Sequence, residues 1–115
     1  MAELYMSGPF KFDSKTIGEK VEEGKIGNYA LGTANHDGTM KTVVYVGRSD
    51  NNLKAELLAR LKTHKHPNFK VSYASSPKEA YAKECQNYHD FDPPQNKVHP
   101  DAPESSNLKC HICGE

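Results

Sequence analysis

Residues 27–47 read GNYALGTANHDGTMKTVVYVG, and this pattern sets the expected architecture. The runs at 29–31 and 43–46 are rich in aliphatic, β-branched and aromatic side chains, which favours β-strands. Between them, Asn35-His36-Asp37-Gly38 contains an Asp-Gly pair that is typical of hairpin turns. The segment therefore predicts two antiparallel strands joined by a turn.

The register of this hairpin decides whether Tyr29 and Tyr45 share a face of the sheet. A two-residue turn at 37–38 pairs Tyr29 with Val46, and this places the tyrosines on opposite faces because strand side chains alternate. A three-residue turn with glycine in the left-handed conformation restores a shared face. A β-bulge at Gly32 does the same. If both tyrosines serve one site, one of these irregularities is expected.

Beyond the hairpin, the sequence predicts two helices and one further strand. The first helix is capped among residues 50–52 and ends near His64, before Pro67. Its apolar stripe consists of Leu53, Leu57, Leu58 and Leu61. Residues 69–73 alternate with period two and predict a third strand. Ser76-Pro77-Lys78-Glu79 combines an N-cap, a proline at the first helical position and a capping-box glutamate, so a second helix is expected to run to about Phe91.

The expected fold is one small α+β domain over residues 1–115. It has a three-stranded mixed or antiparallel sheet flanked by helices, in the order β-β-α-β-α, with a core over about residues 27–91. Residues 92–115 contain four prolines and predict an extended tail. Residues 1–26 give only a short strand signal, where Phe10 and Phe12 flank a lysine.

Charge and hydropathy bear on partners and location. The 115-residue chain has formal net charge zero, yet residues 41–83 hold nine Lys or Arg against three acidic residues. Such a segment can form an anion-facing surface or an ordinary solvated face. No apolar run approaches the roughly 18–20 residues of a membrane span, and no signal peptide is visible. A cytoplasmic protein without a membrane partner is expected, and its oligomeric state is left open.

Several chemistry-bearing residues occur in an order that matches a known constellation. The glycine-tyrosine pairs are Gly27-Asn28-Tyr29 and Tyr45-Val46-Gly47, and the later residues are Arg60, His64, Glu84 and Asn96. Over about residues 27–96 this set resembles the GIY-YIG nuclease superfamily. Asn28 stands where the family motif has isoleucine, and the two tyrosines are farther apart than is usual in the family.

The resemblance implies a metal-dependent endonuclease that hydrolyses phosphodiester bonds of nucleic acid. DNA is the expected substrate in preference to RNA. Tyr29 would be the general base, with His64 as the alternative, and Tyr45 would help to place the water or the phosphate. Arg60 would bind phosphate oxygens through its planar guanidinium. Glu84 would hold Mg²⁺ or Mn²⁺, ions that retain several waters and can assist the leaving oxygen. Since a tyrosine near pKa 10 is a poor base, nearby cations are expected to lower the pKa of Tyr29.

Each of these residues also has a structural interpretation. The tyrosines can be packing residues of the strands, and Arg60 can be a helix residue paired with Glu56 at i, i+4. His64 can interact with the helix dipole, and Glu84 can be a surface charge. The corresponding alternative function is a non-catalytic, zinc-containing module that binds nucleic acid or protein. A zinc-stabilised structural protein is a third possibility.

A second set of residues predicts a structural zinc site. Cys85 and His89 are one helical turn apart on the second predicted helix, and Cys110 and Cys113 form a C-x-x-C pair. Three thiolates and one imidazole suit a closed tetrahedral Zn²⁺ site that would fasten the tail to the helix. His99 and His111 are competing ligands. The alternatives are a buried Cys85 with a frayed tail, or a redox C-x-x-C.

Overall fold

The computed structural model describes residues 6–37, 39–63, 65–91 and 93–96. The element order is β1 (Ser7–Lys11), α1 (Ser14–Lys20), β2 (Gly27–Ala34), β3 (Met40–Ser49), α2 (Leu53–Arg60), β4 (Asn68–Tyr73) and α3 (Pro77–Phe91). The hairpin, the third predicted strand and both predicted helices are present. No helix in the described ranges is long and apolar enough to cross a bilayer.

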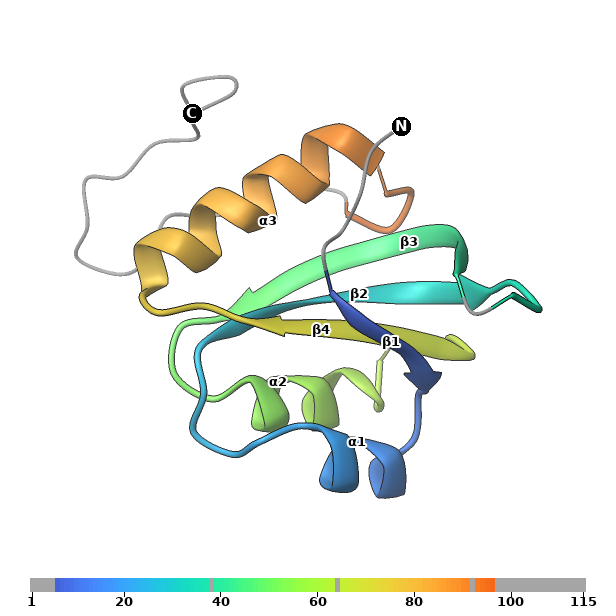
Figure 1. Ribbon diagram of the computed structural model, residues 1–115, viewed down its shortest axis with the longest axis horizontal. Coiled ribbons are helices and arrows are strands. Elements are labelled where there is room, and N and C mark those ends of the chain that lie inside the picture. The colour runs from blue at the N-terminus through green and yellow to red at the C-terminus, as the bar shows by residue number, and fades with distance from the viewer. Residues whose placement is uncertain (1–5, 38, 64, 92, 97–115) are drawn as a thin grey trace.

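The sheet is fully antiparallel, with strand order β1-β4-β2-β3. Helices α1 and α2 cover one face and α3 covers the other, which gives three layers (Figure 1). The α+β class is thus confirmed. The expected sheet of three strands is wrong, because β1 adds a fourth strand beside β4.

The N-terminal elements form for local reasons that the sequence shows only faintly. In β1, Phe10 pairs with Phe69 of β4, and their rings lie 5.6 Å apart. Helix α1 begins after Asp13, whose carboxylate accepts a hydrogen bond from the Thr16 N–H at 2.8 Å. Only Ile17 of this seven-residue helix is buried. A single buried side chain sets up no helical periodicity, so the pattern at residues 1–26 could not reveal the helix.

The β2–β3 register is irregular at two points, between Leu31 and Gly32 and between Thr33 and Ala34. Leu31 pairs with Tyr45, but Gly32 pairs with Val43, so the register shifts between Leu31 and Gly32. A bulge at Gly32, one of the two expected alternatives, is therefore present. With both shifts in place, Tyr29 pairs with Gly47 and Tyr45 pairs with Leu31, so the two tyrosines share a face. A Cβ at Gly32 would lie 1.9 Å from a backbone oxygen of β3, so this close approach requires glycine.

The two faces of the sheet have different interiors. The main core lies between the sheet and α1 and α2, and consists of Phe12, Ile17, Val21, Tyr29, Leu31, Leu53, Leu57, Phe69 and Val71. The α3 face has a smaller apolar cluster around Ala30 and Val46. It also buries the polar side chains of Asn28, Glu84 and Asn87. These buried polar side chains under α3 indicate that this face of the sheet has a role besides hydrophobic packing.

Candidate active site

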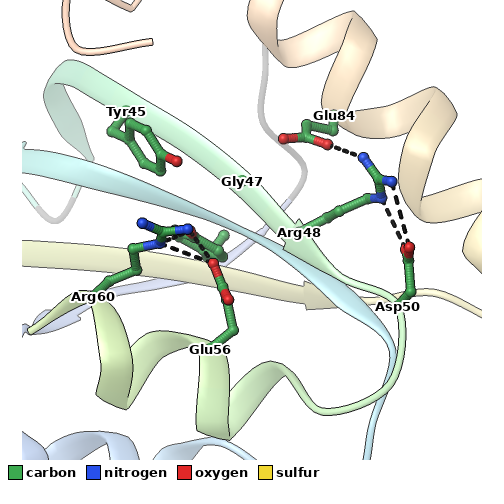
Figure 2. Close-up of a pocket in the computed structure, with 8 residues that line it drawn as sticks. Tyr45, Gly47, Arg48, Asp50, Glu56, Arg60 and Glu84 are labelled. Atoms are coloured by element: carbon green, nitrogen blue, oxygen red, sulfur yellow. Dashed lines mark hydrogen bonds and ion pairs between the residues drawn. The ribbon is translucent and has the colours of Figure 1, made fainter. Parts of the chain in front are cut away.

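One open pocket of about 250 Å³ gathers most of the candidate residues. It is lined by Tyr29, Tyr45, Gly47, Arg48, Asp50, Glu56, Arg60 and Glu84 (Figure 2). Gly47 and Arg48 are neighbours on the edge strand β3 and face opposite sides of the sheet. The pocket therefore lies at the end of an edge strand, where it collects side chains from both helical layers.

The glycines of the two motifs are needed because other atoms approach them closely. A Cβ on Gly47 would lie 2.4 Å from the Tyr29 hydroxyl oxygen and 2.5 Å from Tyr29 Cζ. A Cβ on Gly27 would lie 2.3 Å from the Ser72 carbonyl oxygen. Distances below 3.0 Å do not occur at real Cβ atoms. The glycine of the second motif thus leaves room for the tyrosine of the first.

Tyr29 is held at the floor of the pocket by two residues of α2. Its hydroxyl donates to Glu56 Oε2 at 2.9 Å, and Arg60 Nε–H donates to both Tyr29 Oη at 3.2 Å and Glu56 Oε2 at 2.9 Å. Burial, then the carboxylate of Glu56 and the nearby Tyr45, raise the pKa of the Tyr29 hydroxyl well above 10, against the opposing effect of Arg60. Arg60 thus acts in the expected direction, but burial, Glu56 and Tyr45 outweigh it, and the pKa of Tyr29 is raised overall.

Tyr45 and Arg60 form one wall of the pocket. The Tyr45 ring lies 6.1 Å from the ring of Tyr29, and the Arg60 guanidinium lies 5.7 Å from the Tyr45 centroid. Arg60 uses Nε for its contacts with Tyr29 and Glu56. Its two terminal nitrogens have no hydrogen bond among the described residues, so they remain available to an anion. The i, i+4 pairing of Arg60 with Glu56 is also present.

Arg48 connects the opposite wall of the pocket, and the sequence did not single it out. Its Nη1 contacts Glu84 Oε1 at 2.5 Å, and its Nε contacts Asp50 Oδ1 at 2.8 Å (Figure 2). The guanidinium also lies 5.1 Å from the Tyr81 ring centroid. A basic residue directly after Gly47 and two residues before an acid was the available signal. Nothing in the local pattern connected it with Glu84, which is 36 residues away.

Glu84 is a buried carboxyl group with one oxygen left for a ligand. Its residue is 8% exposed, and burial raises its pKa to about 7 although the contact with Arg48 opposes that shift. Oε1 is occupied by Arg48, while Oε2 has no hydrogen bond among the described residues. A single free carboxylate oxygen in an open pocket fits Mg²⁺ or Mn²⁺, because such ions use few protein ligands and keep their waters. The described ranges contain no group of three or more His, Cys, Asp or Glu suited to a metal.

The remaining candidates fall partly outside the described residues. His64, His99, Cys110, His111 and Cys113 all lie outside them. Helix α3 carries Cys85, which is fully buried, and His89, which is partly exposed, one turn apart. The geometry of the predicted zinc site is thus defined for two of its four ligands, and the site itself stays a prediction.

Asn96 acts behind the pocket and not in it. Its Nδ2 donates to the Val46 carbonyl oxygen at 2.9 Å, and its Oδ1 accepts from the Val46 N–H at 2.8 Å. Val46 lies between Tyr45 and Gly47, so the amide holds the strand at the point where two pocket residues leave it. Gln95 N–H also donates to the Val44 carbonyl oxygen at 2.9 Å.

Comparisons with known proteins give no relative from which a function can be transferred. No family model matches the chain, no curated protein matches it, and no solved structure matches it. The functional argument therefore depends on the residues of the pocket.

Proposed function

We propose that this protein is a metal-dependent endonuclease with a GIY-YIG type of active site. The observation that carries the proposal is the convergence of Tyr29, Tyr45, Arg60 and Glu84, from β2, β3, α2 and α3, on one open pocket. The order of these four residues in the chain also resembles that of the GIY-YIG constellation. Independent packing roles give no reason for all four to meet.

The charges of the pocket suit a divalent ion together with a phosphodiester. Asp50, Glu56 and Glu84 face two guanidiniums, Arg48 and Arg60, which leaves one net negative charge when all three carboxylates are ionised. A divalent cation would reverse this to one positive charge. One phosphodiester group, with its single negative charge, would then bring the pocket to neutrality. The same pocket without a cation would repel a phosphate.

The chain's own residues divide the work of hydrolysis. Glu84 would hold the metal through its free oxygen, and the bound ion would supply charge neutralisation and assistance to the leaving oxygen. Arg60, oriented by Glu56 and by the Tyr45 ring, would direct its terminal nitrogens at the phosphate. Tyr29 would accept a proton from the attacking water. Tyr45 would help to confine that water beside the phosphate.

The wider surface is consistent with a nucleic-acid partner. None of the nine Lys and Arg residues between positions 41 and 83 is fully buried, and all but Arg48, which is paired with Asp50 and Glu84, are candidates for phosphate contacts. Such side chains can neutralise backbone phosphates without reading a base sequence. We propose DNA, in preference to RNA, as the nucleic-acid partner.

The test is an incubation of purified protein with plasmid, single-stranded and branched DNA and with RNA, with and without Mg²⁺ or Mn²⁺. We expect cleavage that requires a divalent ion and disappears in Glu84→Gln, while the variant stays folded by circular dichroism. Glu23→Gln removes an exposed carboxylate and serves as the matched control. Absence of cleavage of every substrate by folded, metal-supplied protein would overturn the proposal.

A non-catalytic binding module on the same fold is the second candidate, and one observation favours it. Arg48 already neutralises Glu84, so this carboxylate has a structural partner without any metal. The binding module predicts salt-sensitive affinity for nucleic acid without strand cleavage, and the same affinity in Glu84→Gln. The endonuclease predicts turnover that the variant lacks.

We also propose a structural Zn²⁺ held by Cys85, His89, Cys110 and Cys113. Its support is the placement of Cys85 and His89 one turn apart on α3 and the C-x-x-C spacing of the other two. Glu84 and Cys85 are successive residues and project about 100° apart around the helix. The ligands of the two metals would thus leave α3 in different directions.

A further inference from the structure

Glu56 contacts the candidate base Tyr29 as well as Arg60, and this second contact has a chemical consequence of its own. It lies on α2 one turn before Arg60, and its side chain is 26% exposed. One oxygen, Oε2, accepts hydrogen bonds from the Tyr29 hydroxyl and from Arg60 Nε, each at 2.9 Å. Glu56 is thus the only carboxylate among the described residues that contacts the candidate base directly.

The direction of the Tyr29 hydrogen bond follows from the chemistry of the partners. An ionised carboxylate has no proton to give, so the hydroxyl must donate to Glu56. A phenolic oxygen also carries two lone pairs, and Arg60 Nε–H takes one of them at 3.2 Å. The second lone pair is left to accept a proton from a water molecule. Tyr29 is therefore oriented to receive one proton while releasing another.

Tyr29 does not act as a base by first ionising to a free phenolate. Burial and the Glu56 carboxylate raise the pKa of Tyr29 well above 10, so the phenolate is scarcely populated near neutral pH. The groups that face the hydroxyl are Glu56 and Arg60 from α2 and Tyr45 from β3. Of these, Glu56 is the group that accepts a hydrogen bond from the hydroxyl.

We propose that Glu56 is the final acceptor of the proton that the attacking water loses, with the Tyr29 hydroxyl as the relay. As the water oxygen bonds to phosphorus, its proton passes to Tyr29 Oη and the Tyr29 proton passes to Glu56 Oε2. The bond from phosphorus to the leaving oxygen breaks, and its electron pair departs with that oxygen, which takes a proton from solvent. Glu56 ends as a neutral carboxylic acid and then returns its proton to solvent. This inference rests on the proposed endonuclease function.

The kinetic test compares Glu56→Gln with Tyr29→Phe and with the double variant. The glutamine keeps the shape and the contact with Arg60 but cannot accept a proton, so we expect kcat to fall by about a hundredfold or more with KM changed only a few-fold. The double variant should lose no more than either single variant, because the two residues act as one unit. Glu56→Asp retains a carboxylate and should recover part of the activity. Glu19→Gln, an exposed position on α1, is the matched control.

The alternative role of Glu56 is only to hold Arg60, and the same data separate the two. Because the glutamine oxygen can still accept from Arg60 Nε, that role predicts nearly wild-type kcat and KM in Glu56→Gln, and this result would overturn the relay. Wild-type cleavage with unchanged kcat in Glu56→Gln would overturn the relay alone. Absence of any cleavage by the wild type would overturn the proposed function, and the relay with it.

A spectroscopic titration tests the coupling without any substrate. Tyrosinate absorbance is followed as pH rises, and the signal of Tyr29 is identified by subtracting the curve of Tyr29→Phe. We expect Glu56→Gln to lower the pKa of Tyr29, because removal of the negative charge makes the phenolate less unfavourable. Glu19→Gln should leave that pKa in place. An unchanged pKa in folded Glu56→Gln would show that the carboxylate does not act on the hydroxyl, and would refute the relay.

Discussion

The raised pKa of Glu84 predicts that the metal-free protein loses stability as pH rises. The pKa is about 7 in the folded chain against 4.5 for an unperturbed glutamate. Between these values the folded state keeps a proton that the unfolded chain has released. The contribution of this group to the free energy of unfolding is therefore fully present below pH 4.5 and is lost as pH rises through 7.

The size of the effect follows from the difference between the two pKa values. Each unit corresponds to about 1.4 kcal/mol, so we expect a loss of about 3 kcal/mol between pH 4.5 and pH 8 from this group. Glu84→Gln cannot ionise, and the slope that Glu84 causes should disappear in that variant. The difference between wild type and variant isolates the effect from the other titrating groups of the chain.

The assay is urea denaturation at a series of pH values in the presence of a chelator, for wild type, Glu84→Gln and the exposed control Glu23→Gln. Added Mg²⁺ or Mn²⁺ should stabilise the wild type at pH 8, where the carboxylate is ionised, and have little effect at pH 5. Parallel curves for wild type and Glu84→Gln would refute the reasoning, since they would show that the carboxyl titrates alike in the folded and unfolded states.

Three further predictions concern the motif glycine, the arginine and the zinc. Gly47→Ala adds a methyl group against the Tyr29 hydroxyl. It should lower the free energy of unfolding by about 1–3 kcal/mol in urea denaturation and also reduce cleavage. Unchanged stability would contradict the close approach. Arg60→Ala should reduce the cleavage rate by about a hundredfold to a thousandfold and leave the melting temperature nearly unchanged, since the side chain is 35% exposed; a wild-type rate would remove Arg60 from the mechanism. Metal analysis should find about one zinc per chain. A chelator or Cys85→Ser should lower the melting temperature, whereas His111→Ala should not, and protein free of zinc after expression with zinc available would eliminate the site.

The central part of the fold could be predicted because its local signals agree with its tertiary contacts. The cap expected among residues 50–52 is Asn52, whose side chain accepts from Ala55 N–H at 3.3 Å. Helix α3 begins at Pro77, as the capping pattern indicated. A bulge at Gly32 was one of the two irregularities expected if Tyr29 and Tyr45 share a face. Each of these features depends on residues that are close together in the chain.

The features that were missed depend on partners far apart in sequence. Strand β1 gains its place by pairing with β4, about 60 residues later. Arg48 matters because it reaches Glu84. The pKa of Tyr29 is governed by burial beside Glu56, and residue order gives no measure of burial. Sequence order therefore predicted a catalytic role for four of the eight residues that line the pocket. The contacts between those four and the other residues became visible only in the folded structure.

The pairing of Asn96 with Val46 has a consequence for how the molecule behaves among its own copies. β3 is the last strand of the sheet on its side, and a bare edge strand offers unpaired N–H and C=O groups to any extended chain that meets it. The side-chain amide carries the same donor and acceptor as a peptide group, and at Val46 it occupies both positions that an incoming strand would use. The backbone N–H of Gln95 donates to the neighbouring Val44 carbonyl oxygen. The segment that fixes the pocket from behind thus also occupies part of the edge on which a second copy of the chain could pair.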